Sequence, residues 1–361
     1  MPESVIKLVA ADDAEKWQSI LADLVTEPKE LLQILGLEPQ QFPVSEQLLS
    51  AFPLKVPRPY IARMEKGNSA DPLLRQVLPL SIEGPLVKPA VEPTEKPIAK
   101  PPAGQLKEQD SVAATDPLQE QKFNPLSGLL HKYDGRVLLT VAPHCAVHCR
   151  YCFRRGFDYQ SNTPGRLQWH SVFDYIQADP SIKEVIFSGG DPLAVGDRQL
   201  AWLAGQIAAI PHVERLRIHT RTPVVIPQRV TRSLIDWLTG TRLKTVVVLH
   251  CNHAREIDDE VGRAFGMLAT NGITLLNQSV LLRGVNDSSA VLSALSEKLF
   301  SVNVLPYYLH LLDPVPGVEH FDVPESEARQ IVEGMRSRLP GYLVPRLVRE
   351  VAGHPSKLSL G

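Results

Sequence analysis

The chain has 361 residues and a formal charge of −2. This length fits one large α/β domain with smaller additions. The near-neutral charge lacks the basic footprint that nucleic-acid binding usually needs, so a small-molecule site is expected. The first residues lack a signal-peptide pattern, and no run reaches the ~18 apolar residues of a membrane span, which predicts a cytoplasmic protein without membrane contact.

Residues 1–83 are predicted to form a helical region. Apolar residues fall at helical spacing between residues 12 and 36, and Pro28 can open a second helix that ends near Gly36. Residues 56–68 are predicted to be irregular and to lead into a short helix. Residues 84–117 are rich in proline and contain no aromatic residue. They predict a disordered or extended insertion, and a plain linker is favoured over a partner-binding segment.

Strand-like and helix-like patterns alternate from Arg136 onward, which predicts parallel strands covered by helices. Six strands suggest an incomplete (β/α)6 barrel over residues 118–345, although a doubly wound open sheet would give the same alternation. Polar candidates repeatedly follow strand ends, where such barrels place their chemistry, and this favours the barrel. The expected strands are Val137–Val141, Glu184–Phe187, Leu216–Ile218, Thr245–Leu249, Ile273–Leu276 and Val304–Tyr308. The expected helices are Asp197–Ile210, Gln228–Leu238, Glu256–Thr270, Ser288–Phe300 and Pro324–Arg338.

Three of the four cysteines lie within eight residues, as Cys145-x3-Cys149-x2-Cys152. Thiolates at this spacing can converge on one soft metal centre. A fully ligated iron–sulfur cluster takes four cysteines, so a triplet would leave one iron open to a small molecule. A zinc site completed by His144 or His148 is the alternative. A disulfide is disfavoured because three cysteines cannot pair among themselves.

The triplet resembles the signature of the radical S-adenosylmethionine (SAM) enzymes, in which a [4Fe-4S] cluster binds SAM through its open iron. The turn Ser188-Gly189-Gly190-Asp191 follows a predicted strand, and its glycines allow a sharp bend and close backbone approach to a ligand. Alone it is a tight βα turn, but after the triplet it resembles the glycine-rich SAM-binding turn of these enzymes. The same resemblance places two further residues at the SAM site: His250 and Gln278. The fourth cysteine, Cys251, is predicted to be a buried free thiol.

The C-terminal turn Gly353-His354-Pro355-Ser356-Lys357 resembles that of the lysine 2,3-aminomutases, where a glycine-rich turn ends in the lysine that binds pyridoxal 5′-phosphate (PLP). A lysine near a chain end is otherwise an ordinary solvated charge. The resemblance makes Lys357 the catalytic nucleophile toward PLP. The stretch from Arg63 to Asn68, followed by Asp71-Pro72-Leu73, also resembles the amino-terminal region of this family.

The resemblance also implies a substrate pocket. Arg154 corresponds to the arginine that pairs with the amino-acid carboxylate, Asp313 to an aspartate that holds the distal ammonium, and Glu350 to a second aspartate. Two buried carboxylates repel unless a cation lies between them, which favours a lysine-like substrate. Three residues fall where the family binds the PLP phosphate, with a lysine in place of an arginine at the first: Lys132, Tyr133 and Arg136.

The resemblance implies an isomerase that converts L-lysine to (R)-β-lysine by a SAM-initiated radical migration on PLP, with a reductant such as flavodoxin or ferredoxin. The short tail after Lys357, and Ser288 in place of a cysteine, predict no structural zinc. The short tail, Glu350 and the stretch Met64-Glu65-Lys66-Gly67-Asn68 resemble the branch that supplies β-lysine to the ligase that modifies elongation factor P. Two alternatives stay open: a catabolic or biosynthetic aminomutase acting on lysine or another amino acid, and a zinc-binding interaction module. A homo-oligomer is compatible with either enzyme hypothesis.

Overall fold

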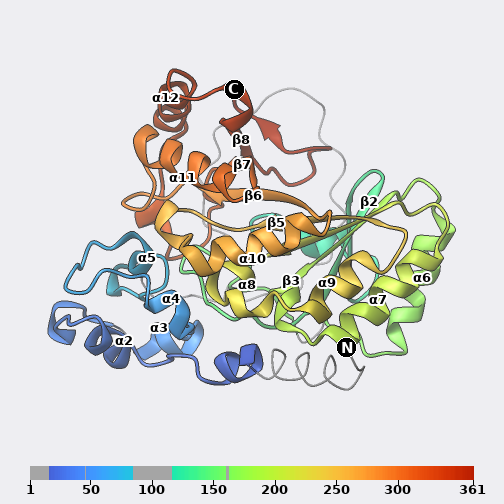
Figure 1. The fold of residues 1–361 in the computed structure, drawn as a ribbon, viewed down its shortest axis with the longest axis horizontal. Helices are drawn as coiled ribbons and strands as arrows, with labels where there is room; N and C mark the ends of the chain where they lie inside the picture. The colour runs from blue at the N-terminus through green and yellow to red at the C-terminus, as the bar shows by residue number, and fades with distance from the viewer. Residues whose placement is uncertain (1–15, 45, 84–115, 160–161) are drawn as a thin grey trace, which may run out of the picture.

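The computed structural model describes residues 16–44, 46–83, 116–159 and 162–361 (Figure 1). Nearly all of the predicted proline-rich insertion lies outside these residues. The described residues form one sheet whose strands neighbour one another in chain order. The strands are β1 Leu129–Tyr133, β2 Arg136–Ala142, β3 Glu184–Gly189, β4 Arg215–Thr220, β5 Lys244–Leu249, β6 Thr274–Val280, β7 Leu305–His310, β8 Arg346–Arg349 and β9 Leu358–Ser359.

Strands β2 to β8 are parallel, whereas β1 and β9 pair antiparallel at the two ends of the sheet. A doubly wound sheet reverses its strand order at a switch point, so the uninterrupted order supports the predicted barrel type. The two ends do not pair with each other within the described residues, and the barrel is therefore incomplete. All six predicted strands are present. The structure adds β8 as a further parallel strand, and residues 346–361 supply β8 and β9 to the same sheet.

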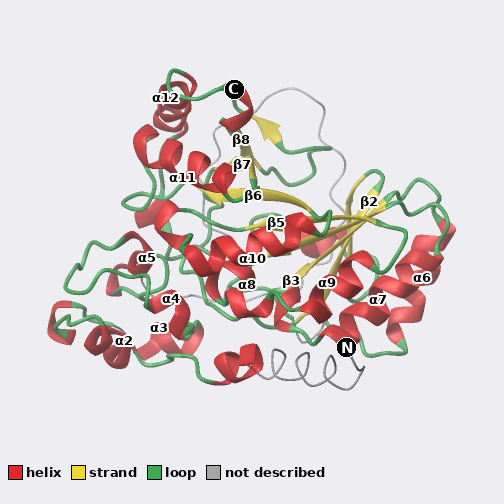
Figure 2. Cartoon of the chain, viewed as in Figure 1, coloured by secondary structure: helices red, strands yellow, loops and turns green. Residues whose placement is uncertain are grey.

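Helices cover the outer face of this sheet (Figure 2). Their apolar residues and one face of the strands form a large core, in which Phe265, for example, is fully buried. Burying such a side chain stabilises the fold by about 1.5–3 kcal/mol. The helices are α6 Gln168–Ala178, α7 Asp197–Ala209, α8 Thr222–Val225, α9 Arg232–Thr239, α10 Asp259–Thr270, α11 Ser289–Ser301 and α12 Glu325–Arg336.

Side-chain caps set where three of these helices begin. Thr231, Asp258 and Ser288 each accept a hydrogen bond from the backbone N–H three residues ahead, at the starts of α9, α10 and α11. Helices α9 and α10 therefore start later than predicted, because short 3-10 turns precede their caps: Pro227–Arg229 and Ala254–Glu256.

The N-terminal region is helical, as predicted. A helix spans residues 16–22, and α2 Pro28–Ile34 begins at its proline and ends before Gly36, whose φ of 67° suits glycine. The short helices α3 Glu46–Ala51, α4 Arg58–Ile61 and α5 Pro72–Arg75 follow. These segments share a second core with Ala146 and Val147 of the cysteine loop, so the N-terminal region packs directly against that loop.

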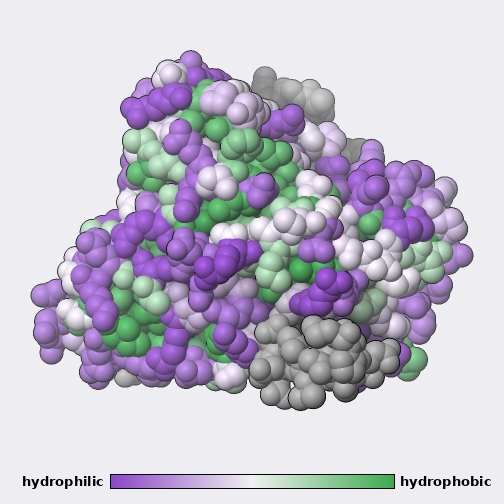
Figure 3. All heavy atoms as spheres, in the orientation of Figure 1, coloured by the Kyte–Doolittle hydropathy of each residue, from purple (hydrophilic) through white to green (hydrophobic). Residues whose placement is uncertain are grey.

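The face shown in Figure 3 is mostly hydrophilic, with hydrophobic atoms gathered near α11 and α12. Phe300 at the end of α11 is 47% exposed, and its ring lies 5.5 Å from that of Tyr342. Among the residues that the structure describes, no helix is long and apolar enough to cross a membrane.

Candidate active site

A cavity of about 790 Å³ lies on the inner face of the sheet. Ile186 of β3 and Val246 of β5 line it, whereas their chain neighbours Val185 and Val247 belong to the core under the helices. The volume falls within the range typical of small-molecule sites. Every site residue predicted from the sequence lines this cavity: Lys132, Tyr133, Arg136, Cys145, Cys149, Cys152, Arg154, Ser188, Gly189, Gly190, Asp191, His250, Gln278, Asp313, Glu350 and Lys357.

The loop after β2, which carries Cys145, Cys149 and Cys152, is the cysteine end of the cavity. The N-terminal region holds its backbone, since His148 N donates to Lys55 O at 3.0 Å and Arg150 N donates to Gln76 O at 2.9 Å. These contacts join segments about seventy to a hundred residues apart, so the loop depends on the N-terminal region for its conformation.

A buried ion pair reinforces this attachment. Arg150 Nη2 lies 2.6 Å from Glu83 Oε2, and both side chains are fully buried. Arg150 Nε contacts both Glu83 oxygens, and Nη1 donates to Phe52 O at 2.8 Å. Arg155 also reaches Glu83, at 3.0 Å. A buried ion pair is stable only when its remaining donors and acceptors also have hydrogen-bond partners, as most of them have here.

Arg221, which sequence analysis missed, links the cysteine loop to several elements. Its Nη1 donates to Cys149 Sγ at 2.7 Å and to Tyr151 OH at 2.7 Å, and its Nη2 donates to Gln76 Oε1 at 2.7 Å. The predicted His250 joins the same network, with Nε2 2.9 Å from Tyr151 OH. Burial, and then the charge of Arg221, lowers the pKa of His250 well below its usual range, so its ring is neutral.

The turn after β3 requires its two glycines. Gly189 has φ 107°, and a Cβ added there would lie 2.8 Å from Ala142 O. A Cβ at Gly190 would lie 2.3 Å from His144 O. Any side chain at either position would therefore push the turn away from the cysteine loop.

Asp191 in this turn is a structural residue. Oδ1 accepts from Leu193 N at 3.0 Å and Thr220 Oγ1 at 2.6 Å, while Oδ2 accepts from Arg221 N at 2.7 Å and Thr222 N at 2.9 Å. Four donors satisfy the buried carboxylate. Asp191 therefore ties the ends of β3 and β4 together.

Arg154 already holds a carboxylate of the chain itself. Its Nε and Nη2 donate to Glu120 at 2.8 and 2.7 Å, and its Nη1 donates to Ser188 Oγ at 3.1 Å and Gly189 O at 3.3 Å. A guanidinium has five N–H donors, so these four contacts leave one for a ligand. No local sequence pattern around Glu120 predicts that it pairs with Arg154.

The opposite part of the cavity, around Lys357, is the lysine end. Glu350 is its centre: Oε1 accepts from Lys132 Nζ at 2.6 Å and from Tyr133 OH at 3.0 Å, and Oε2 pairs with Lys357 Nζ. Burial alone would raise the pKa of Glu350, but the ammonium groups of Lys357 and Lys132 hold that pKa well below its usual range. Glu350 is therefore a carboxylate shared by two cations.

Asp313 follows β7 and is partly buried. Burial, reinforced by the negative charge of Glu350, raises the pKa of Asp313 to about 7. The carboxyl group is thus balanced between its neutral and charged forms near neutral pH, and a bound cation would favour the charged form.

Two histidines on the inner face of the sheet were missed as site residues. His219 of β4 and His310 of β7 line the cavity, and the Nε2 atom of each is buried without a hydrogen-bond partner within the described residues. Burial, followed by the charge of Lys357, lowers the pKa of His310 to about 3. Both rings offer neutral hydrogen-bonding groups to a ligand. The alternation of β4 and β7 could have identified them.

Comparison with known proteins decides the family. No protein-family model matches the chain. The L-lysine 2,3-aminomutase of Escherichia coli (strain K12) is 46% identical over 352 residues, covering 96% of this chain and 94% of the relative. That of Haemophilus influenzae is 45% identical, covering 96% and 95%, and that of Clostridium subterminale is 34% identical, covering 98% and 79%. The chain belongs to the L-lysine 2,3-aminomutase family.

The fold was also compared with solved structures. A radical SAM methyltransferase from Sphaerobacter thermophilus is 20% identical with a TM-score of 0.42, covering 61% of this chain and 68% of the other. That likeness is too weak to support a conclusion about this protein.

The cysteine end fits the iron–sulfur cluster of the aminomutase family. Cys145, Cys149 and Cys152 are all free thiols that line the cavity. Burial raises the pKa of Cys152 to about 11, and a positive centre such as iron would favour its thiolate form. His148, one of the two histidines considered for the zinc alternative, has its Nδ1 2.8 Å from Pro53 O, and its ring stacks on Phe52. Cys251 is a buried free thiol, as predicted.

The lysine end fits PLP. Lys357 lies in the cavity with a partly exposed side chain, so its amine can reach a bound aldehyde. Arginine, lysine and tyrosine side chains from β1 and β2 surround the same space. The aminomutase family's three cofactors, a [4Fe-4S] cluster, SAM and PLP, therefore all have matching groups in this one cavity.

Proposed function

We propose that the protein is an L-lysine 2,3-aminomutase that forms (R)-β-lysine. The observation that carries the proposal is that Cys145, Cys149, Cys152 and Lys357 line a single cavity. When bound, the cluster and SAM would supply a radical that removes hydrogen from carbon 3, and PLP would supply a conjugated ring that stabilises the radical while the substrate nitrogen moves from carbon 2 to carbon 3. The protein's residues hold the lysine between these groups.

Charge at both ends of the cavity selects the substrate. Arg154 offers an N–H to the α-carboxylate, with its guanidinium held by Glu120 and Ser188. Asp313 and Glu350 line the same cavity, and the charge of Glu350 adds to the effect of burial in raising the pKa of Asp313. A distal ammonium between them would relieve their repulsion, whereas a neutral side chain would not. This favours lysine over shorter or apolar amino acids.

Lys357 alternates between two partners in this proposal. It pairs with Glu350 when free, and it leaves that pair when its amine attacks PLP. Glu350 then keeps Lys132 as its counter-ion at 2.6 Å, so its charge stays compensated. Because the ammonium of Lys357 must lose a proton before its amine attacks, the group of Glu350 and its two lysines changes from a net charge of +1 to neutral.

The proposal extends to the cellular setting. The enzyme acts in the reducing cytoplasm with a flavodoxin- or ferredoxin-type reductant, and its product serves the ligase that modifies elongation factor P. Residues 16–83 serve to hold the cysteine loop, residues 118–345 form the barrel, and residues 346–361 carry the PLP lysine.

The test is an anaerobic assay. The purified protein is analysed for iron, sulfide and PLP, then incubated with SAM, a reductant and L-lysine, and the products are separated by chiral chromatography. Formation of (R)-β-lysine that requires all three additions supports the proposal. Faster turnover of another amino acid would favour a catabolic or biosynthetic aminomutase, and zinc without iron or sulfide would favour an interaction module.

A further inference from the structure

Arg221 brings a permanent positive charge to the sulfur of one cysteine of the triplet. Its Nη1 donates to Cys149 Sγ and to Tyr151 OH, each at 2.7 Å, and its side chain is only 6% exposed. A guanidinium keeps its charge in proteins, and its hydrogen bonds to anionic acceptors are stronger than those of neutral donors. The cysteine end therefore contains a buried cation in contact with a cluster ligand, and the proposed function does not yet use it.

A carboxylate on the other side of the guanidinium fixes its position. Arg221 Nη2 lies 3.1 Å from Glu256 Oε2, and it donates to Gln76 Oε1 at 2.7 Å and to Tyr60 OH at 3.1 Å. The side chain of Glu256 is fully buried. Because Nη2 is held by these three acceptors, Nη1 is kept directed at Cys149. The contact with the sulfur is thus part of the folded network.

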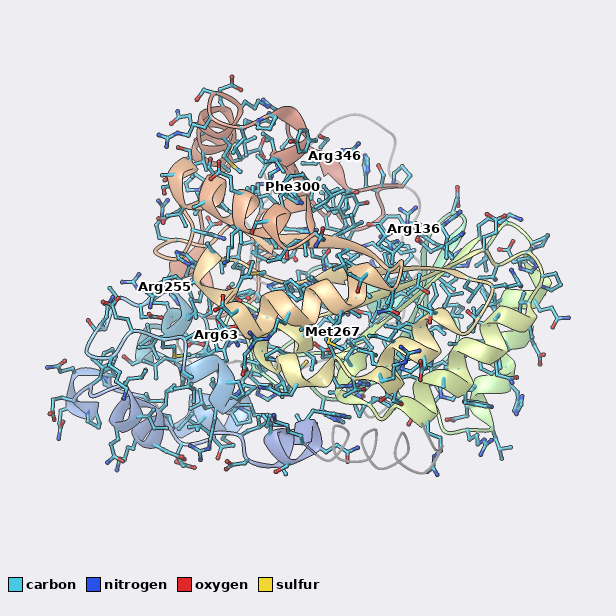
Figure 4. The ribbon with its side chains drawn as sticks, viewed as in Figure 1. Arg63, Arg136, Arg255, Met267, Phe300 and Arg346 are labelled. Carbon is cyan, nitrogen blue, oxygen red and sulfur yellow. The ribbon has the colours of Figure 1, made fainter. Side chains whose placement is uncertain are left out.

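Glu256 is itself held by the N-terminal region and by the loop after β5. Its Oε1 accepts from Asn252 N at 3.0 Å and from Gln76 Nε2 at 3.1 Å, and its backbone oxygen accepts from Arg63 Nη1. Arg255 Nη2 donates to Arg63 O at 3.4 Å. Figure 4 shows Arg63 and Arg255 where the N-terminal helices meet the barrel. The N-terminal region therefore fixes the carboxylate that in turn fixes Arg221.

A cation in this position affects the energy of adding an electron to the cluster. One-electron reduction adds a negative charge to a cluster whose three thiolate ligands are already anionic. Hydrogen bonds to the sulfurs and nearby positive charges stabilise the reduced form more than the oxidised form, and so raise the reduction potential. Burial strengthens the effect, because little water screens the charge. The contact between Arg221 and Cys149 supplies both the hydrogen bond and the charge.

We propose that Arg221 is a positioning residue that acts through Cys149 to raise the reduction potential of the cluster. One electron then passes more readily from the flavodoxin- or ferredoxin-type reductant to the cluster, and Glu256 limits the effect by compensating part of the charge of Arg221. The inference rests on the proposed function in taking Cys145, Cys149 and Cys152 as the ligands of the cluster.

The test measures the reduction potential in the absence of SAM and lysine. The full-length protein with its cluster reconstituted is titrated electrochemically, and the reduced cluster is followed by visible absorbance and by electron paramagnetic resonance. In Arg221→Gln, the ratio of reduced to oxidised cluster at a fixed potential is expected to fall roughly tenfold, as for the loss of one hydrogen bond to a charged group. For a one-electron couple this is a downward shift of about 59 mV. An unchanged potential with wild-type iron and sulfide content would overturn the proposal.

Glu256→Gln is the matched control, because it changes the same guanidinium from the other side and leaves the contact with Cys149 in place. It removes the compensating negative charge, so the potential should stay at the wild-type value or rise. A general disturbance of the network would instead move the potential in the same direction in both variants. A fall in Glu256→Gln equal to that in Arg221→Gln would therefore contradict the proposal.

A double variant guards against loss of the fold. Arg221→Gln leaves the buried Glu256 carboxylate without its cation, which destabilises the folded protein. The combination of Arg221→Gln with Glu256→Gln removes both charges together, and its potential should lie below that of Glu256→Gln alone, because Cys149 again lacks its donor. A potential that is not lower, or loss of iron and sulfide from both Arg221 variants, would show that Arg221 only holds the loop and would refute the proposal.

Failure of the proposed function gives a different result. Zinc without iron or sulfide in the wild-type protein would show that the assignment of the three cysteines is wrong before any potential is measured. A wild-type protein that holds the cluster and forms (R)-β-lysine, together with Arg221→Gln at the wild-type potential, would leave the proposed function intact and reject only the role of Arg221.

Discussion

The two ends of the cavity are built in opposite ways. At the cysteine end, hydrogen bonds to distant residues hold the backbone of the loop, and the Arg150–Glu83 pair is fully buried. At the lysine end, one carboxylate is shared by two cations, Asp313 has a pKa near neutrality, and Lys357 is partly exposed. The first arrangement resists change, and the second consists of contacts that can be exchanged.

This difference fits the function expected of each end of the cavity. A cluster bound by three cysteines needs its ligands held in one geometry before it binds, which favours a rigid loop. A lysine that attacks an aldehyde must leave its ion pair, which favours shared and replaceable partners. The site therefore combines a fixed half and an exchangeable half.

The largest effect is expected at the exchangeable half. Lys357→Ala should abolish both turnover and the absorbance of lysine-bound PLP, because Lys132, the other lysine that lines the described cavity, serves as the counter-ion of Glu350. Iron and sulfide content should stay at the wild-type level, since Lys357 does not contact the cysteine end. A parallel loss of iron would show that the two halves are not independent.

A substitution in the fixed half is expected to act by lowering the stability of the folded protein. Glu83→Gln leaves the buried Arg150 charge unpaired and should lower the free energy of unfolding by about 3–5 kcal/mol. Denaturant unfolding and iron content measure the two consequences. Asp236→Asn is the matched control, because it breaks the exposed Arg232–Asp236 pair, whose side chains are 72% and 58% exposed, and should change stability by less than about 1 kcal/mol. Equal losses in both variants would contradict the account.

Asp313 should give the reaction a pH dependence. Its pKa of about 7 lies above the ordinary aspartate value, so the free enzyme holds it neutral below pH 7 and charged above it. Binding of an ammonium requires the charged form. The kcat/KM for L-lysine should therefore rise about tenfold between pH 6 and pH 8. Asp313→Asn should remove this rise, and a rise that persisted in the variant would assign it to another group.

Substitution of Glu120 is expected to have the smallest effect on activity. Glu120→Gln keeps the shape of the side chain but offers one acceptor instead of two, so the Arg154 guanidinium loses part of its orientation. We expect KM for L-lysine to rise about threefold, with kcat nearly unchanged, as for the loss of one weak positioning contact. A lower KM would show instead that Glu120 competes with the substrate carboxylate.

Local patterns predicted most of the barrel. Alternating apolar residues placed the six strands, and helical spacing placed α7 and α9 to α12. Strand β8 was not predicted because it has only four residues, with an arginine at each end. Helix α6 was overlooked although Trp169, Val172, Phe173 and Ile176 carry the helical spacing and are buried.

The residues of the candidate site also differ in whether the sequence alone could predict them. Residues within short motifs, such as the cysteine triplet and Lys357, could be recognised from the sequence. Glu83, Glu120 and Arg221 could not, because each acts on a residue at least thirty positions away and has no motif around it. The role of Asp191 also required the structure, since only the fold brings the end of β4 to its carboxylate.

The central claim is that both ends act on one substrate within one cavity of one chain. Coexpression of Cys149→Ala chains with Lys357→Ala chains tests it directly, with the β-lysine formed by the mixed protein compared with that formed by each variant alone and by the wild type. The account predicts no activity in the mixture, because no chain has both ends intact. Recovery of about a quarter or more of the wild-type activity would show that the two ends come from different chains and would contradict the claim.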